Sequence, residues 1–489
     1  MSLEKDIENN ILNLEKKIGD CVDFVSRKIF FAHTEKYFYI AYFESLANEE
    51  LIDRQVIESL SRSKIDKRKN LDIFLELKSR LLVTSGVQQT ENFELILTMI
   101  LSGETILFLD NCDQALIIST RKFPTRGIQN CQIESGVYGS KDAFCEVMRF
   151  NTALIRRRIR DINLKIKQVR LGTRTQTDVA IIFLSDIVHI EILNKIENKI
   201  NDINLDSILD VGYLQEFFDS EQKSIFPRSQ LTERPDKTAS AILEGRVAIL
   251  VDNSPFALIL PATLSTFFQA SEDYSERFWI MNFLRSLRYF AAVIATCLPG
   301  FFLAVINSRE NFLPIKFLLK IEQERRNVAF RSSFVELISM LIAFELLSEA
   351  GVRLPNPIGG TIGIVGGIIV GQAAAEAGLV TPIVIIIMAI TSIASFSIPN
   401  ANFVSALRIL KYLILIPAAF LGLSGFVLSV LILLTHLCSL ESFGIPYLHP
   451  FVSGEINNFN DFEDSIFRVQ IFNMKKPIFS NNFSKKNKN

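Results

Sequence analysis

The chain of 489 residues is 49% hydrophobic and 21% charged, with a mean hydropathy of +0.27. This composition is too apolar for an ordinary soluble protein and too charged for one that lies wholly within a membrane, so it indicates a hybrid of both. The 52 basic and 53 acidic residues nearly cancel, which gives no support to nucleic-acid binding.

Patterns for metal binding and catalysis are missing from the sequence. The six cysteines form no CxxC pair and the four histidines have no ligand spacing, so neither a disulfide framework nor a zinc site is predicted. There is no nucleophile elbow, P-loop or pair of carboxylates in a pocket-like context. We therefore expect no enzyme activity, with no catalytic, cofactor-binding or metal-binding residues and no cofactor.

The first 288 residues contain no apolar run long enough to span a membrane. Short β-rich runs alternate there with amphipathic helical patterns, which predicts an α/β region of two subdomains. The predicted order is an N-terminal helical segment (1–26), subdomain 1 (27–135), a linker with a basic helix (136–166) and subdomain 2 (167–270). Because the N-terminus lacks an apolar core of signal-peptide length, this region is expected in the cytoplasm.

The two subdomains are predicted to be related repeats. Residues 102–118, SGETILFLDNCDQALII, parallel residues 244–260, EGRVAILVDNSPFALIL, at an offset of 142. A second pair, FYIAYFE (38–44) and VAIIFLS (179–185), agrees at an offset of 141. Asp-Asn tolerates positive φ in turns, so each copy predicts a hairpin, with chance similarity as the alternative.

The linker helix carries Arg156, Arg157 and Arg158, followed by Arg160. Such a run is usually a solvated face. The alternatives are docking against an acidic neighbour or against anionic lipid headgroups.

An interfacial helix (271–288), with Trp279 at headgroup depth, is expected to precede a membrane domain (289–451) of four to six segments. The long candidates are 289–306, 358–375, 379–399 and 412–437. A shorter segment, 334–347, carries the intramembrane acids Glu336 and Glu345 and is re-entrant, interfacial or pore-facing. The remainder, 452–489, predicts a variable, partly disordered tail.

Glycines are concentrated in the second long membrane candidate. Spaced four residues apart, the helix-packing positions are Gly359, Gly363, Gly367 and Gly371, continued by Ala375. They form one smooth stripe on a helix, along which another backbone can approach closely. A glycine inside a helix costs roughly 1 kcal/mol relative to alanine, so the stripe predicts a close helix or subunit contact in lipid.

The opposite face of the same helix changes from apolar to polar along its length. Its residues, the candidates for lining a pore, are Ile362, Val365, Ile369, Gln372 and Glu376. Apolar rings can gate a channel by dewetting, and a carboxylate ring attracts cations. The alternative is an ordinary packed membrane helix whose face meets lipid or another subunit.

Several stretches together resemble the A subunits of GerA-type spore germinant receptors. They are NTALIRRRI (151–159), TERPDK (232–237) with EGRVAILVDNSPF, EDYSERF (272–278), RLPNPIGGTIGIVGGIIVGQAAAEAGLVTP (353–382), ASFSIP (394–399) and HLCSLESFGIPYLHPF (436–451). The matches run from about residue 81 to 451. The linker sequence YGSKDAF (138–144) and Glu441 depart from the family's pattern.

The resemblance implies a multi-pass subunit of a nutrient receptor in the spore inner membrane. It implies as partners a permease-like B subunit, a lipoprotein C subunit and membrane lipids, without nucleic acid. The A subunits are expected to form a homo-oligomer, a pentamer being the expected ring, that acts as a ligand-gated ion channel. The alternative is a non-conducting scaffold or signal-coupling subunit, and a secondary transporter ranks third because no inverted repeat is evident.

Overall fold

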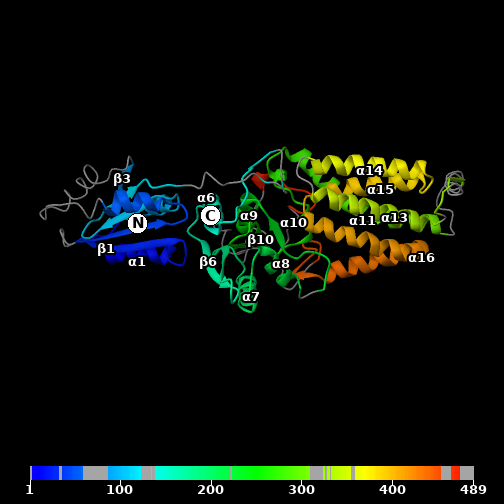
Figure 1. Ribbon diagram of the computed structural model, residues 1–489. Coiled ribbons are helices and arrows are strands. Elements are labelled where there is room, and N and C mark those ends of the chain that lie inside the picture. The colour runs from blue at the N-terminus through cyan, green and yellow to red at the C-terminus, as the bar shows by residue number, and fades with distance from the viewer. Residues whose placement is uncertain are drawn as a thin grey trace. The chain divides into compact units, whose positions relative to one another are not determined.

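The computed structural model describes residues 3–31, 36–58, 86–122, 131, 134, 138–220, 223–308, 323–324, 328–330, 332–353, 358–452 and 464–473. The chain forms two compact units, which are described separately. The N-terminal unit comprises residues 1–221, 229–262 and 475–489, and the helical unit comprises 222–228 and 263–474. The first holds two five-stranded sheets and the second holds the long helices (Figure 1).

The first sheet of the N-terminal unit is antiparallel, with the strand order β1-β2-β4-β5-β3. The strands are β1 (Phe24–Phe31), β2 (Lys36–Phe43), β3 (Val87–Thr90), β4 (Thr105–Leu109) and β5 (Ala115–Ile118). The helical segments are α1 (Ile7–Ile18), α2 (Glu49–Leu51), the π-helical turn η1 (Ile52–Ile57) and α5 (Phe93–Ile100).

Both faces of this sheet are covered, as its central strand β4 shows. Ile106 and Phe108 lie in one apolar cluster with α1 and α5, whereas Leu107 and Leu109 lie in a second cluster with η1. Successive side chains of a strand point to opposite faces, so a strand covered on both faces is apolar at every position. The helix expected within segment 1–26 thus contributes to the core of the first repeat.

The second sheet has the same plan, with the order β6-β7-β9-β10-β8. Its strands are β6 (Leu164–Leu171), β7 (Thr177–Leu184), β8 (Gln230–Thr232), β9 (Val247–Val251) and β10 (Ala257–Leu260). Its helices are α6 (Met148–Arg158), α7 (Ile190–Asn201), α8 (Val211–Asp219) and α9 (Pro235–Leu243).

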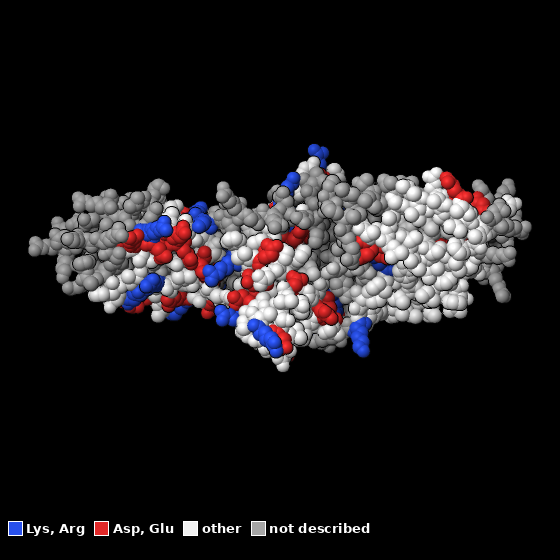
Figure 2. Space-filling model, in the orientation of Figure 1, with Lys and Arg blue, Asp and Glu red and all other residues white. Residues whose placement is uncertain are grey.

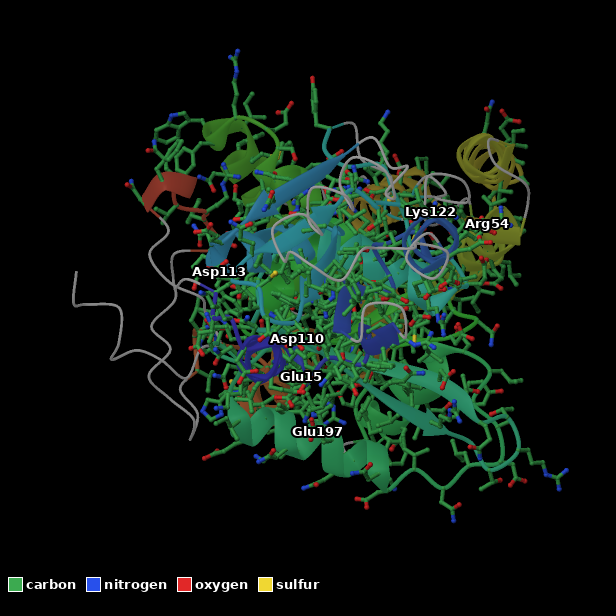
Figure 3. All side chains as sticks on the ribbon, turned by 90° about the vertical axis from the view of Figure 1, so that its left-hand side faces the viewer. Glu15, Arg54, Asp110, Asp113, Lys122 and Glu197 are labelled. Carbon is green, nitrogen blue, oxygen red and sulfur yellow. The ribbon has the colours of Figure 1, made fainter. Side chains whose placement is uncertain are left out.

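The predicted duplication is confirmed, because β4 and β9 occupy the same third position in their sheets. Each hairpin turns at the predicted Asp-Asn pair, where Asn111 has φ 60° and Asn253 has φ 69°. Because the strands of both sheets pair antiparallel, the fold of this unit is α+β, a more specific class than the expected α/β region. Charged residues such as Glu15, Arg54 and Asp113 lie exposed on the surface (Figure 3). The cores on the sheets are apolar.

The basic linker helix docks against acidic neighbours, one of the three alternatives from the sequence. Arg156 is buried, and its Nη2 lies 2.7 Å from Asp23 Oδ1 of the first repeat. Arg158 Nη2 lies 2.6 Å from Asp142 Oδ2. The helix therefore joins the two repeats within the N-terminal unit.

Long apolar helices dominate the second unit, whose described surface is mostly uncharged on the face in Figure 2. They are α11 (Phe278–Asn307), α13 (Ser333–Arg353), α14 (Ile358–Glu376), α15 (Pro382–Phe396) and α16 (Ala401–Ser439). Among the described residues, α11 and α16 are the helices long and apolar enough to cross a membrane, and α15 is a shorter apolar helix. Short elements complete the unit: α10 (Leu264–Phe268), the 3-10 turns η3 (Ser271–Tyr274) and η4 (Ile471–Asn473), and the pair β11 (Glu441–Ser442) and β12 (Ile445–Pro446).

The segment expected as a separate interfacial helix, 271–288, is divided differently. It begins with the turn η3 and continues from Phe278 as the first part of α11. The 30 residues of α11 are one helix, which contains Pro299. Neither glycine nor proline occurs between Phe278 and Pro299, so the aromatic, arginine-bearing start continues without a break into the apolar part.

The helix α16 reverses its direction, whereas its sequence predicted one span over 412–437. Phe403 near its start and His436 near its end both lie against Phe226, with ring centroids 6.2 and 6.3 Å away. A straight helix would separate these two residues by roughly 50 Å. The reversal occurs at Gly422, whose backbone is non-helical with φ 60° and ψ −137°. Positive φ combined with a ψ of this size is adopted readily only by glycine, so this residue permits a helical hairpin.

Candidate functional site

The glycine side of α14 packs against helices of the same chain. A Cβ atom built on Gly367 would lie 3.1 Å from Phe344 Cε1 of α13, and one on Gly371 would lie 3.2 Å from Ile385 Cγ2 of α15. Gly366, which the sequence stripe did not include, is tighter, at 2.7 Å from Leu347 Cδ1. Ala375 is half-buried, and the surroundings of Gly359 and Gly363 lie outside the described residues.

The opposite side of α14 is exposed where it is described. Ile369 is 60% exposed, and Gln372 Nε2 donates a 2.8 Å hydrogen bond to Glu376 Oε1 one turn later. The side chains of Ile362 and Val365 lie outside the described residues. An apolar residue followed by an amide and a carboxylate thus forms a continuous exposed strip at the C-terminal end of the helix.

Glu336 is fully buried and joins two helices. Its Oε2 accepts hydrogen bonds from Thr381 N at 3.0 Å and Thr381 Oγ1 at 2.8 Å. Thr381 is the N-cap residue of α15, and Pro382 is its first residue. The carboxylate of α13 therefore satisfies a backbone donor at the start of α15, where free N–H groups favour negative charge.

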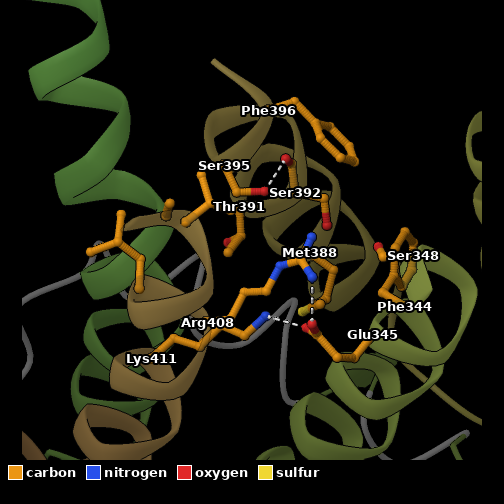
Figure 4. Close-up of a pocket in the computed structure, with 13 residues that line it drawn as sticks. Phe344, Glu345, Ser348, Met388, Thr391, Ser392, Ser395, Phe396, Arg408 and Lys411 are labelled. Carbon is orange, nitrogen blue, oxygen red and sulfur yellow. Dashed lines mark hydrogen bonds and ion pairs between the residues drawn. The ribbon is translucent and has the colours of Figure 1, made fainter. Parts of the chain in front are cut away.

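Glu345 has a different environment, an ion-paired pocket among α11, α13, α15 and α16 (Figure 4). Its Oε1 lies 3.2 Å from Arg408 Nη1, and its Oε2 lies 3.0 Å from Lys411 Nζ. The adjoining cavity has a volume of about 30 Å³, room for about two water molecules. Its lining includes Phe344, Ser348, Met388, Thr391, Ser395 and Phe396.

A charged cluster holds residues 464–473 against the start of α11, within the segment predicted as a variable tail. Arg285 Nη1 lies 2.6 Å from Asp464 Oδ1, and Arg285 Nε lies 2.9 Å from Asp273 Oδ2. Asn282 and Arg468 exchange two hydrogen bonds between the amide side chain and the backbone, at 3.0 and 2.7 Å. These residues are buried. The rest of the predicted tail, apart from 452, lies outside the described residues.

The ERPDK stretch (233–237) makes several polar contacts within the N-terminal unit. Arg234 is buried, and its guanidinium donates to Glu134 O at 3.0 Å, Ser140 O at 2.8 Å and Asp236 Oδ2 at 2.7 Å. Lys237 Nζ lies 3.1 Å from Glu134 Oε1. The motif therefore binds Glu134, just before the linker, and Ser140, within it, to the start of α9.

Next to this motif, burial raises the pKa of the Cys131 thiol to about 11. Arg234 opposes the rise, and Glu233, Asp236 and Glu134 add to it. The thiol donates to Asp142 O at 3.4 Å. Cys131 is thus held protonated rather than prepared as a nucleophile.

The sequence identified Glu336 and Glu345 but missed the partners of Glu345 and the Asp464 cluster. Arg408 and Lys411 interrupt an apolar run three residues apart, a spacing that places them on one helix face. That pattern was a usable signal for an acidic partner. Among the described residues, no group of three or more histidine, cysteine, aspartate or glutamate side chains is arranged to hold a metal ion.

Comparisons with known proteins cover nearly the whole chain. Residues 12–478 match the family model described as Bacillus/Clostridium GerA spore germination protein. The chain is 35% identical to "Uncharacterized membrane protein YfkQ" of Bacillus subtilis (strain 168), over 93% of this chain and 88% of that protein. It is 33% identical to "Spore germination protein KA" of the same organism, over 95% and 84%. A solved structure, the N-terminal domain of the A subunit of the Bacillus megaterium spore germinant receptor GerK3, matches with a TM-score of 0.44 and 27% identity, over 54% of this chain and 98% of that one.

Proposed function

This chain belongs to the GerA family of Bacillus/Clostridium spore germination proteins, and we propose that it is the A subunit of a nutrient receptor that forms an oligomeric, ligand-gated ion channel. The channel lies in the spore inner membrane, which the helical unit crosses several times, with the N-terminal unit in the cytoplasm. The subunit acts together with a permease-like B subunit and a lipoprotein C subunit.

The channel proposal rests on one observation: one side of α14 is packed against neighbouring helices and the opposite side is exposed. The described glycines of α14 pack against α13 and α15 of the same chain. This close helix packing therefore needs no second subunit. Ile369, Gln372 and Glu376 remain on the exposed side. An exposed carboxylate on a helix of an apolar unit requires water or a partner. A ring of subunits with this side inward gives Glu376 water and places Ile369 as an apolar constriction beside it.

Ion selectivity tests the assignment of Glu376. Full-length protein, assembled with its partner subunits in liposomes, is expected to conduct cations in the presence of germinant. Glu376→Gln removes the carboxylate ring and lowers the cation-to-anion permeability ratio by about threefold or more, since such a ring concentrates cations at a pore mouth. Glu349→Gln, which alters an exposed acid of α13, is the matched control and leaves the ratio unchanged. Equal ratios in all three proteins would remove Glu376 from the conducting path.

Thiol accessibility tests Ile369 independently of selectivity. In a background with the six native cysteines replaced, Ile369→Cys is expected to react with a water-soluble thiol reagent in the presence of germinant and to change the flux. Val384→Cys, at a buried position of α15, is the control. Failure of the reagent to reach position 369 under any condition would contradict the pore assignment.

The alternative function is a non-conducting scaffold that couples the receptor to downstream proteins. The joining of the two repeats through Arg156 and Asp23 favours it, because a rigidly linked pair of domains suits transmission of a signal. Assembly with the partner subunits and a normal germination response, without ion flux from the reconstituted complex, would support this function over the channel.

A further inference from the structure

The Glu345 pocket carries an excess positive charge. Arg408 and Lys411 both face Glu345, which is the only acidic residue among the described residues that line the cavity. One carboxylate neutralises one of the two cations. The pocket formed by described residues therefore has a formal net charge of +1.

This charge lies in surroundings that make it costly. The Lys411 side chain is only 12% exposed and that of Arg408 is 28% exposed, and the neighbouring residues Met388, Phe344 and Leu407 are apolar. A cation removed from water is strongly destabilising unless an anion compensates it. A second negative group at the cavity would compensate this charge where water reaches it least, at Lys411.

Donors are available for such a group. An arginine and a lysine side chain carry eight N–H donors between them, and their ion pairs to described residues are the two with Glu345. Thr391 and Ser395 line the cavity, but their hydroxyls donate to carbonyl oxygens of their own helix at 2.7 Å each, as the dashed line between Ser395 and Ser392 shows (Figure 4). The unused cationic donors are therefore the groups that would bind an incoming oxyanion.

The position of the pocket along the helices indicates the source of the anion. Arg408 lies seven residues after the start of α16 at Ala401, roughly 10 Å along the axis, so the pocket lies near the end of this apolar helix rather than at its middle. At the rim, Phe396 is 69% exposed and the nearby Ile393 is 66% exposed. The basic side chains in the pocket suit a phosphate group, and the apolar side chains at its rim suit acyl chains. Basic pockets between membrane helices bind such lipid headgroups.

We propose that the pocket formed by Glu345, Arg408 and Lys411 binds the phosphate of an anionic phospholipid. One or two phosphate oxygens enter the cavity, which has room for about two water molecules, and meet Arg408 and Lys411. The rest of the headgroup lies at the mouth of the cavity, and the acyl chains lie over Phe396 and Ile393. Free inorganic phosphate offers the same oxyanion chemistry without the apolar part. This site is independent of ion conduction by α14.

Native mass spectrometry of the full-length protein in neutral detergent measures the binding. Phosphatidylglycerol is titrated in one arm, phosphatidylcholine in a second and phosphatidylglycerol with inorganic phosphate as competitor in a third. Lys411→Gln and Arg408→Gln are each expected to weaken phosphatidylglycerol binding about fivefold, the effect of about one basic side chain on an anionic headgroup. Lys411→Arg retains the charge and the binding.

Glu345→Gln separates a lipid site from an ion pair that serves stability alone. Removing the competing carboxylate is expected to strengthen phosphatidylglycerol binding, whereas loss of a purely structural pair would lower thermal stability without changing lipid affinity. Arg174→Gln, an exposed basic residue of the N-terminal unit, is the control. Competition by millimolar phosphate would assign the site to the free anion, and its absence to the lipid. Equal phosphatidylglycerol binding by the wild type, Lys411→Gln and Glu345→Gln would overturn the proposal.

Discussion

Glu336 and Glu345 both lie on the apolar helix α13, but the first has neutral hydrogen-bond donors as neighbours and the second has cations. Glu336 meets the backbone N–H and hydroxyl of Thr381, which need an acceptor at a helix start. Glu345 meets two full cations. Capping explains Oε2 of the first, whose buried Oε1 has no hydrogen-bond partner among the described residues, whereas the second leaves one cation uncompensated. A carboxylate in a membrane segment is thus a functional candidate only after its partners have been identified.

Cys131 provides a prediction at the same scale, with a defined pH dependence. Burial raises its pKa to about 11 from the ordinary 9.0, so at pH 8 the thiolate fraction is about a hundredfold lower than that of an unperturbed thiol. We expect iodoacetamide to modify Cys131 about a hundredfold more slowly in the folded protein than in urea, and the rate to rise tenfold per pH unit up to about pH 11.

Mass spectrometry of peptides after timed alkylation gives this rate for Cys131 separately from the other cysteines. Arg234→Gln removes the positive charge that opposes the rise of the Cys131 pKa, so the folded variant is expected to be modified still more slowly at pH 8. A folded rate equal to the rate in urea at pH 8 would show that the linker does not cover Cys131.

The helical hairpin of α16 depends on a second glycine besides Gly422. A Cβ atom on Gly425 would lie 2.2 Å from Pro417 O and 2.7 Å from Leu421 Cβ. Real Cβ atoms do not approach a backbone oxygen so closely, so Gly425→Ala must open the reversal. We expect a loss of about 1–3 kcal/mol in the free energy of unfolding, the range for overpacked sites, although alanine is usually the better helix former.

Thermal unfolding in detergent, followed by circular dichroism, measures the loss. Ser424→Ala, at the exposed neighbouring position, is the control and should change the midpoint little. A Gly425→Ala protein as stable as the Ser424→Ala protein would contradict the tight reversal.

At the scale of the whole molecule, the N-terminal unit depends on a buried charge pair between its repeats. Arg156 is fully buried, lies 4.1 Å from the centre of the Phe43 ring and binds Asp23. Arg156→Met leaves Asp23 without its cation and should cost about 3–5 kcal/mol, the penalty for breaking a buried pair. Arg149→Met, on the same helix but with a side chain 71% exposed, should cost less than about 1 kcal/mol.

Chemical unfolding of the full chain in detergent compares these variants. The double variant Arg156→Met with Asp23→Leu should recover much of the loss, because both charges are then removed. Equal losses for Arg156→Met and Arg149→Met would show that the contact between repeats contributes nothing beyond an exposed ion pair.

The sequence determined those features that depend on neighbours within a few residues. The two Asp-Asn hairpins follow from turn chemistry and β-rich runs on either side, and the repetition of this pattern predicted two sheets of one topology. The spacing of Gly367 and Gly371 likewise predicted a smooth side on α14, and helical periodicity placed Ile369 and Glu376 opposite to it. Local geometry fixes each of these, so one sequence suffices to predict them.

Only the tertiary structure decided which distant residues meet. Gly422 looks like any other glycine in an apolar run until packing against other helices makes a reversal favourable. Glu345 finds its cations more than sixty positions later, and Asp464 reaches Arg285 from a segment whose composition predicted a partly disordered tail. Such pairings are selected by burial and charge compensation after the chain has closed long loops, and no local pattern encodes the outcome.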